Sequence, residues 1–369
     1  MCKILNLSSH PIIMKIFIYI SQPHVGGSDT YIRNIHRLFV KKYPTTEFIE
    51  NAHELHHLVN WRNDQKAVLL NLSYPKDLLV VILLWILRVP TINIVHGLWF
   101  LESKSMNPRQ SNFDTIFYWL SQYLICIFSV RNVVVCEYEK KNAIKYFPSI
   151  STKLVLIPGA ADSNIFKMTR NSKKNVRNSL NLPLKTKILI VVSRIERRKA
   201  LETTLYAMRK VIHSHANIQL LIIFPSSCFN QMDYLEELLK LVDNLHLGGS
   251  VHFLTGLTKA QLVPYYQSAD LFLMSSKDLE NFSLSVIESL SSGCPVLTFN
   301  TGGTPELINQ VDSRLVIENN TPFDLAEKIE WYFSLSPEQI NKLKFKSASV
   351  ARRYSWKKSF DAFEKLIKE

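Results

Sequence analysis

Cysteine is scarce in this sequence, and its spacing excludes two kinds of small, cross-linked protein. Five cysteines are spread over 369 residues, at positions 2, 126, 136, 228 and 294. They lie too far apart for a metal knuckle, and their odd number in so long a chain argues against a disulfide framework. A reducing, cytoplasmic environment fits this cysteine content best.

Long apolar runs are also missing. The most apolar segment, residues 78–87 (LLVVILLWIL), is about half as long as a bilayer crossing requires, and residues 116–128 are interrupted by Ser121 and Gln122. We expect both segments to form buried core helices. Residues 1–13 show no small-residue cleavage pattern, so we expect an extension or a misassigned start there rather than a signal peptide.

Negative charge is in the minority. The chain has 44 Lys and Arg against 31 Asp and Glu, a formal net charge of +13. This excess favours an anionic partner, such as nucleic acid, an acidic membrane surface or a phosphorylated small molecule. The sequence contains no zinc knuckle and no recognition-helix module, and its positive charge is spread along the chain, so we expect no nucleic-acid partner.

The length of the chain predicts two domains, because one hydrophobic core rarely supports so many residues. From Met14 onward, short β-branched runs such as KIFIYI alternate with helical periods, which predicts a parallel, doubly wound α/β sheet. A second series of this kind opens with KILIVVSR. The predicted boundaries are an extension over 1–13, a Rossmann-like domain over 14–165, a basic linker over 166–185, a second Rossmann-like domain over 186–350 and a terminal helix over 351–369.

Two strand ends offer candidate ligand contacts. Ligands in open α/β sheets bind beyond the carboxyl ends of strands, where helix N-termini present free backbone amides. Gly26 and Gly27 follow the first strand in this way, although an ordinary tight turn has the same pattern. In the second series, Arg194 and Lys199 could hold a diphosphate, and a solvated basic loop is the alternative.

The same loop carries two further cations. Arg197 and Arg198 lie between the two candidate phosphate ligands. We expect both side chains to be solvated.

Two carboxylates flank the next strand-to-helix turn. Glu280 follows the run LFLMSS and is expected at the ligand-facing edge, and the helix is expected to begin near Ser283 or Ser285. Ser285 and Glu288 also have the spacing of a capping box, in which Glu288 would bond the Ser285 amide. Capping does not explain an acid at position 280.

These motifs resemble one enzyme family. The stretch ENFSLSVIESLSSGCPVLTFNTGGTPELI, residues 280–308, resembles the signature of the family 4 retaining glycosyltransferases. The segments SRIERRKALETTLYA, VLIPGAADSNIF and KIFIYISQPHVGGSDTYI resemble other parts of that family. The resemblance implies a GT-B architecture, in which two Rossmann-like domains face a central cleft. The first would bind the acceptor and the second the nucleotide-sugar donor, and the terminal helix would cross back to the first.

The resemblance also assigns the site. The expected catalytic residues are Glu280 and His96, and the expected donor-binding residues are Arg194, Lys199, Phe282, Ser283, Leu284, Glu288, Gly26 and Gly27. Glu280 would contact the transferred sugar, and Glu288 the ribose hydroxyls. His96 would contact the reacting sugar or the acceptor; its alternative is a strand-end histidine bonded to backbone. Ser283 stands where the family usually has glycine.

The expected reaction is a metal-independent hexosyl transfer. No Asp-x-Asp sequence occurs, so no obvious carboxylate pair could hold a diphosphate-bound metal, and we expect no cofactor. The resemblance implies that a sugar passes with retention from a UDP- or GDP-sugar to a glycan or lipid-linked acceptor, in the synthesis of cell-surface polysaccharide, lipopolysaccharide or glycolipid. The alternatives are a sugar-nucleotide epimerase of the same fold and a non-catalytic basic binding partner.

A basic row on the first helix suggests a membrane contact. Arg33, Arg37 and Lys41 are spaced four residues apart along one helix face. Such a row is usually a solvated face. Since family members often act on lipid-linked acceptors, we also expect it to attract an anionic membrane surface from the cytosolic side.

Overall fold

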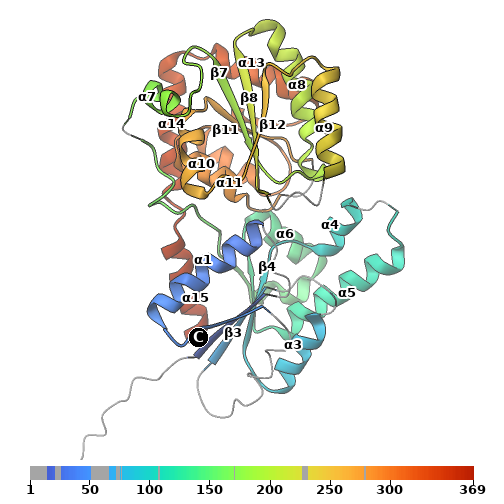
Figure 1. The fold of residues 1–369 in the computed structure, drawn as a ribbon. Helices are drawn as coiled ribbons and strands as arrows, with labels where there is room; N and C mark the ends of the chain where they lie inside the picture. Colours follow the sequence, from blue (N-terminus) through green and yellow to red (C-terminus); the bar gives the residue numbers. More distant parts are fainter. Residues whose placement is uncertain are drawn as a thin grey trace, which may run out of the picture.

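The computed structural model describes residues 15–20, 26–50, 66–71, 75, 77–106, 109–169, 171–226, 232–277 and 280–369. Over these ranges the chain forms two lobes stacked on one another, each built around a six-stranded parallel sheet (Figure 1). We call the part that contains the sheet β1–β6 the first lobe and the part that contains β7–β12 the second lobe. The predicted α/β fold with two parallel sheets is confirmed.

The first sheet has the strand order β2-β1-β3-β4-β5-β6. Its strands are β1 (Lys15–Ile20), β2 (Glu47–Ile49), β3 (Lys66–Asn71), β4 (Thr91–Val95), β5 (Arg131–Val134) and β6 (Leu154–Leu156). β1 lies between β2 and β3, with Tyr19 opposite Ile49 on one side and Leu70 on the other. The carboxyl ends of all six strands therefore meet at one edge of the sheet.

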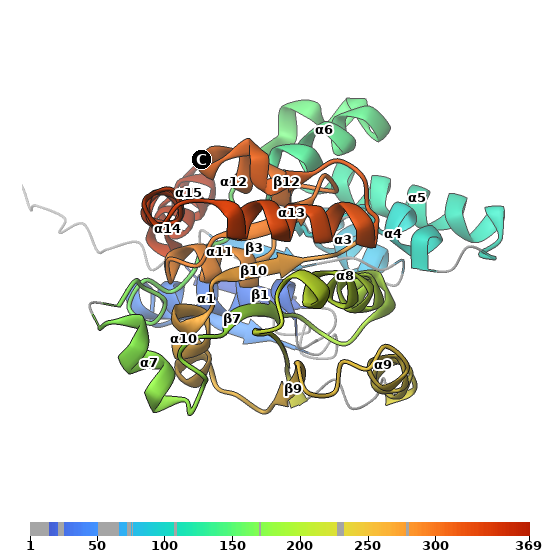
Figure 2. The same cartoon turned by 90° about the horizontal axis from the view of Figure 1, so that it is seen from above.

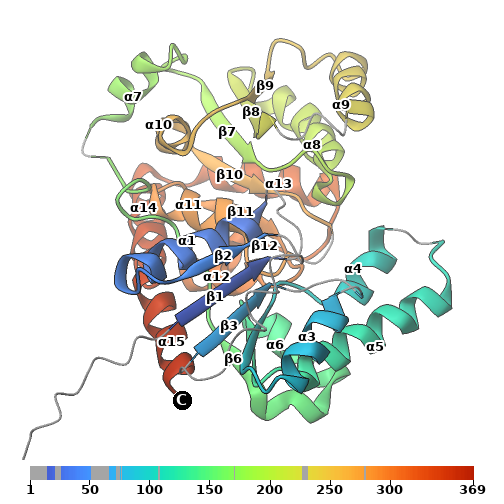
Figure 3. The ribbon, with the colours of Figure 1, turned by 60° about the horizontal axis from the view of Figure 1, so that its bottom comes forward.

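Helices cover both faces of this sheet. They are α1 (Gly27–Lys42), α3 (Asp77–Ile86), α4 (Trp99–Met106), α5 (Asn112–Phe128), α6 (Glu137–Tyr146) and the last helix of the chain, α15 (Trp356–Lys368), with the 3-10 turn η2 (Pro148–Lys153). α15 packs against α1, and α3 and α5 lie on the other side of the lobe (Figures 1 and 3). Trp356, Phe360 and Phe363 of α15 complete the core beneath α1, so the end of the chain returns to the first lobe.

Much of the apolar surface of α3 and α5 is exposed, which corrects the expectation that both are buried core helices. The exposed side chains are Leu79, Leu83, Trp85 and Ile86 on α3 and Phe113, Ile116, Phe117 and Leu120 on α5. We call these eight side chains the α3–α5 apolar surface. An apolar run predicts a helix, but it does not show how much of the helix surface finds a partner. Within the described ranges, no helix is both long and apolar enough to cross a membrane.

The second sheet has the strand order β12-β11-β10-β7-β8-β9. Its strands are β7 (Lys187–Val192), β8 (Ile218–Phe224), β9 (Val251–Thr255), β10 (Leu271–Met274), β11 (Val296–Phe299) and β12 (Val316–Ile317). Most of the strand residues are buried, as expected for a parallel sheet that helices cover on both faces.

The helices of the second lobe surround this sheet, with α7 and α9 at opposite sides (Figure 2). They are α7 (Lys173–Ser179), α8 (Leu201–Ser214), α9 (Met232–Asn244), α10 (Lys259–Ser268), α11 (Leu284–Ser291), α12 (Thr304–Val311), α13 (Pro322–Ser334) and α14 (Pro337–Ala351), with the 3-10 turns η3 (Arg197–Lys199) and η5 (Ser313–Leu315). After α14 the chain leaves the second lobe and continues into α15.

The predicted basic linker contains α7, which packs against α10. Lys173 forms an ion pair with Asp270, and the Arg177 Nη2 atom lies 2.8 Å from Asp270 Oδ2. Asp270 also accepts a 2.7 Å hydrogen bond from the Ile188 amide at the start of β7. One partly exposed acid, Asp270, therefore holds part of this basic stretch against the second sheet.

Candidate active site

The buried Lys199 and the partly buried Glu280 form an ion pair at the carboxyl edge of the second sheet. Lys199 ends the turn η3 after β7, and Glu280 lies on the loop after β10. Burial alone would raise the pKa of Glu280, but the positive charges of Lys199, Arg198 and Arg194 outweigh it and hold this pKa below its ordinary value. Glu280 is therefore an anion at neutral pH.

Two arginines extend this positive cluster. Glu196 bridges them, with one carboxylate oxygen 2.6 Å from Arg194 Nη1 and the other 2.8 Å from Arg198 Nε. Burial would lower the pKa of Arg198, but the charges of Glu280 and Glu196 raise it above its ordinary value. Arg198 therefore belongs to the cluster, and the expectation that it is merely solvated is wrong. The neighbouring Arg197 is exposed, as predicted.

A glycine of the first lobe, Gly26, lies next to Arg194 of the second lobe. Gly26 precedes α1, and a Cβ atom placed on it would lie 3.7 Å from the Arg194 Cζ atom. Gly27 is the first residue of α1, and a Cβ atom there would meet no atom of the described residues within 4 Å. Gly26 thus places backbone, without a side chain, next to Arg194, which is predicted to bind the diphosphate.

His96 follows β4 in the first lobe, and one of its ring nitrogens is buried. Its Nε2 atom is buried and has no hydrogen-bond partner among the described residues. Its ring packs edge-on against Tyr31, with ring centroids 5.1 Å apart, and burial lowers the pKa of His96 to about 4. His96 is therefore neutral at pH 7, and the free nitrogen favours a ligand contact over the alternative of a histidine bonded only to backbone.

Glu288 lies on α11 but does not cap it. α11 begins at Leu284 with Ser283 as its N-cap, and within the described residues Ser283 makes no side-chain capping bond. The predicted capping box between Ser285 and Glu288 is therefore wrong. The Glu288 carboxylate accepts a 3.3 Å hydrogen bond from the Tyr266 hydroxyl instead.

The surroundings of Glu288 connect it to the first lobe. Burial raises the pKa of Glu288 to about 7, and the charge of Lys259 offsets this rise in part. A pocket of about 30 Å³ contains Glu288 and Lys259 together with Thr30, Asn34 and Arg37 of α1. Glu288 therefore faces the boundary between the lobes, where a ribose could lie.

Phe282, Ser283 and Leu284 lead into α11. A Cβ atom on Gly159, in the segment that leaves the first lobe, would lie 3.1 Å from both the Phe282 ring and Leu284 Cδ2. The Ser283 side chain is buried, and its hydroxyl lies 3.1 Å from that of Ser285. The serine that replaces the usual glycine therefore turns its hydroxyl toward the helix.

Sequence reasoning missed the turn that supports Glu280. Gly302 has a φ of +67°, which favours glycine, and a Cβ atom there would lie 2.5 Å from the Glu280 carbonyl oxygen. The Gly303 amide donates a 2.8 Å hydrogen bond to that same oxygen. In the sequence the Gly-Gly pair is visible only as part of a motif, because its need for close backbone approach depends on segments more than 20 residues apart.

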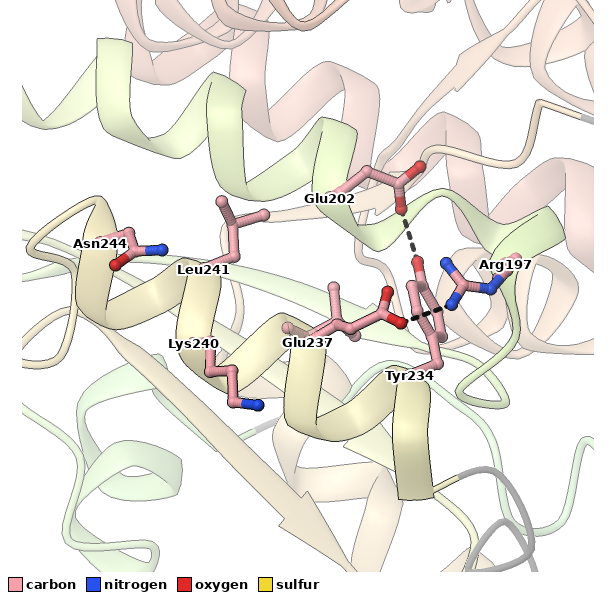
Figure 4. Close-up of a pocket in the computed structure, with 8 residues that line it drawn as sticks. Arg197, Glu202, Tyr234, Glu237, Lys240, Leu241 and Asn244 are labelled. Atoms are coloured by element: carbon pink, nitrogen blue, oxygen red, sulfur yellow. Dashed lines mark hydrogen bonds and ion pairs between the residues drawn. The ribbon is translucent and has the colours of Figure 1, made fainter.

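A separate pocket of about 380 Å³ opens on the second lobe, between α8 and α9 (Figure 4). Inside it, Arg197 Nη2 lies 2.6 Å from Glu237 Oε1, and the Tyr234 hydroxyl donates a 2.5 Å hydrogen bond to Glu202. Its described lining includes none of the predicted site residues. These polar groups bind one another, and we assign the pocket no ligand.

Comparison with known proteins identifies the family. Residues 172–348 match the family model described as glycosyl transferases group 1. The D-inositol 3-phosphate glycosyltransferase of Corynebacterium jeikeium (strain K411) is 25% identical over 291 residues, which is 77% of this chain and 69% of that relative. The second lobe matches the group 1 glycosyl transferases. The predicted family and the predicted enzyme class, a glycosyltransferase, are confirmed. Other relatives of the same name are matched over about half of their own length.

Solved structures identify the fold of this glycosyltransferase. Sucrose-phosphate synthase from Thermosynechococcus elongatus has a TM-score of 0.78 at 18% identity, covering 96% of this chain and 98% of that one. HepE from Anabaena, solved in complex with UDP, has a TM-score of 0.77 at 16% identity, covering 96% and 99%. The glycosyltransferase thus has the predicted GT-B architecture.

Proposed function

We propose that this glycosyltransferase moves a hexose-type sugar from a UDP- or GDP-sugar to a hydroxyl of a glycan or lipid-linked acceptor, with retention of the anomeric configuration. The observation that carries the proposal is the Glu280–Lys199 ion pair, which lies near Arg194 and Arg198. Gly26 of the other lobe lies next to Arg194. Such a cluster suits a substrate that has a diphosphate next to a sugar. HepE, which has a similar structure, was solved in complex with UDP, and this supports a nucleotide-sugar donor here.

The cations stabilise the leaving group. As the bond from the anomeric carbon to the phosphate oxygen breaks, negative charge grows on the nucleoside diphosphate, and Arg194, Arg198 and Lys199 stabilise that charge. The acceptor oxygen bonds to the same face of the anomeric carbon, and its proton passes to the departing phosphate oxygen. The step needs no cofactor and no metal ion, so EDTA should leave turnover unchanged.

Four further groups orient the donor and the sugar. The anionic Glu280 accepts hydrogen bonds from sugar hydroxyls. The Nε2 atom of His96, which has no partner among the described residues, contacts the sugar or the acceptor. Glu288 accepts hydrogen bonds from the ribose diol, for which a carboxylate with two oxygens is suited. Phe282, Ser283 and Leu284 supply the first backbone amides of α11 to the phosphates.

Donor binding and acceptor dependence test this function. A thermal-shift screen of UDP- and GDP-sugars should find a stabilising donor, and that donor should be consumed only when an acceptor is present. An epimerase would convert the donor without an acceptor. The variant Glu280→Gln should stay folded and lose turnover by at least about 100-fold, because the negative charge beside the sugar is lost. The exposed Glu327→Gln serves as control, and wild-type activity in Glu280→Gln would overturn the site.

Contact with an anionic membrane surface, on the cytosolic side, is part of the proposal, but the basic row on α1 is a poor candidate for it. Arg33 is paired with Asp29 at 2.9 Å and with Glu50 at 2.6 Å. Arg37 lines the small pocket beside Glu288. Two of the three predicted cations thus have other contacts.

The α3–α5 apolar surface is the better candidate. Exposed aromatic and aliphatic side chains enter the interface of a bilayer readily, and the exposed Arg88 and Arg109, next to the ends of α3 and α5, match anionic lipid. α5 also holds the active-site loop, since Gln122 accepts a 3.0 Å hydrogen bond from the Trp99 amide and donates a 2.8 Å bond to the Gly97 carbonyl. A membrane on this surface would lie near the loop that carries His96, which supports a lipid-linked acceptor.

A further inference from the structure

A carboxylate of the second lobe binds the end of a helix in the first lobe. Glu306 lies on α12, and its two oxygens accept hydrogen bonds from the Glu137 amide at 3.0 Å and the Tyr138 amide at 2.5 Å. These amides open α6, which lies at the top of the first lobe and faces the second (Figure 1). The first amides of a helix have no partner within the helix, and they carry the positive end of its dipole. A bidentate carboxylate is therefore well suited to this position.

The turn before α12 holds the backbone on which Glu280 lies. The Gly303 amide donates a 2.8 Å hydrogen bond to the Glu280 carbonyl. A Cβ atom on Gly303 would lie 2.2 Å from the Asn281 carbonyl oxygen and 2.5 Å from the Cys136 sulfur of the first lobe. Gly303 thus lies between the loop of the catalytic carboxylate and the residue that caps α6.

The neighbour of Glu280 makes a second bond between the lobes. The Asn281 Nδ2 atom donates a 2.8 Å hydrogen bond to the His96 carbonyl oxygen. It also lies 3.5 Å from Glu139 of α6, whose other carboxyl oxygen accepts a 2.9 Å bond from the Val135 amide. The loop of Glu280 and the loop of His96 are therefore connected through the end of α6.

We propose that Glu306 is a positioning residue, which fastens α6 to the Gly302–Gly303 turn so that docking of the lobes and placement of Glu280 occur together. Glu306 contacts no reacting atom. It acts through the Gly302–Gly303 turn. The Gly303 amide binds the Glu280 carbonyl, while the Glu306 side chain binds α6 of the first lobe. The catalytic part of this inference rests on the proposed function, whereas the mechanical part does not.

The competing explanation is that Glu306 only caps α6 and does not affect the Glu280 loop. A cap alone would protect the first amides of α6 and leave the Glu280 loop unaffected when it is removed. Coupling predicts that both places loosen together. The two explanations differ in the Gly303 amide, whose proton is held by the Glu280 carbonyl.

Hydrogen exchange of the full chain separates the two explanations. In Glu306→Ala, peptides that contain the first turn of α6 and peptides that contain Gly303 should both exchange at least about tenfold faster than in the wild type. The matched control is Glu137→Gln, which removes a carboxylate from the same helix end but keeps the backbone amide that Glu306 binds. It should leave both rates within about twofold. Faster exchange in α6 alone, or no change in either place, would overturn the proposal.

Kinetics with the donor found by thermal shift supply the second readout. Glu306→Ala should lower kcat by about tenfold, equivalent to about 1.4 kcal/mol. The Kd of the nucleoside diphosphate should change less, because its charged ligands Arg194 and Lys199 lie in the second lobe. Glu306→Gln keeps one carbonyl acceptor and should recover part of the loss. An unchanged kcat in Glu306→Ala would contradict the positioning role. If no nucleotide sugar is turned over, the proposed function fails, and the exchange rates still decide whether Glu306 couples the lobes.

Discussion

At the scale of single residues, two carboxylates eight positions apart have opposite electrostatic surroundings. Glu280 lies beside three cations and is an anion at neutral pH. Glu288 lies beside a tyrosine hydroxyl, and burial raises its pKa to about 7. The same side chain thus serves as a fixed charge in one place and as a group that is half protonated near neutral pH in the other.

The raised pKa of Glu288 predicts a stability that falls as pH rises. Below pH 4.5 the carboxyl is protonated in both the folded and the unfolded chain, and it costs nothing. Between pH 4.5 and pH 7 the unfolded chain loses the proton while the folded chain keeps it, so stability is lost. Glu288→Gln removes this cost, and it should raise the free energy of unfolding at pH 8 by as much as about 3 kcal/mol.

Urea unfolding at pH 8 and pH 4.5 measures this effect. The gain should be present at pH 8 and absent at pH 4.5. In the same variant the affinity for the nucleoside diphosphate should fall, because the amide cannot accept both ribose hydroxyl protons. A variant that is equally destabilised at both pH values would contradict the assigned environment of Glu288.

At the scale of elements, the sequence predicted the strands well because they are buried on both faces. A parallel strand covered by helices needs a short β-branched run. KIFIYI matches β1 residue for residue, and the first six residues of KILIVVSR form β7. The three-residue β2 and the two-residue β12 carry no such pattern. The expected burial of α3 and α5 was wrong, because an apolar run describes a helix and not the surface against which it packs.

Part of the candidate site could also be predicted from the sequence. Arg194, Lys199 and Glu280 all follow strands of one sheet, and parallel strands bring such positions to one edge. Arg198, Asn281 and Glu306 escaped prediction because their roles depend on contacts with other loops. For Glu306 the partner amides lie 168 and 169 positions away in the chain. No local pattern reports such a contact.

The α3–α5 apolar surface predicts selective binding to anionic vesicles. Wild-type protein should co-sediment with vesicles that contain phosphatidylglycerol more than with neutral ones, because exposed apolar side chains and flanking arginines act together. The double variant Phe113→Ser/Ile116→Ser should lose at least about half of this binding. Both side chains are more than 60% exposed, so the fold should persist.

An exposed aromatic residue on the other lobe supplies the control for vesicle binding. Phe345 on α14 is 65% exposed, and Phe345→Ser should bind vesicles as the wild type does. If the wild type were recovered equally with neutral and with anionic vesicles at low salt, the proposed membrane contact would be wrong.

At the scale of the whole molecule, the last helix of the chain is part of the core of the first lobe. Phe363 of α15 is fully buried and packs near Tyr31, which in turn contacts the His96 ring. Phe363→Ala should therefore lower the free energy of unfolding by about 3–5 kcal/mol. Phe345→Ala should change it by less than about 0.5 kcal/mol. Urea unfolding measures both values. If the two variants lost the same free energy of unfolding, α15 would not be part of the core.

Over the part of the chain that the structure describes, the polypeptide passes between the lobes once between β6 and β7 and again between α14 and α15. A protease that nicks the first passage leaves the amino-terminal fragment bound to the other through α15, without a peptide bond between them. The two fragments should therefore migrate as one particle under native conditions and separate only in denaturant. Splitting the gene at this passage should likewise yield halves that reassemble when they are co-expressed.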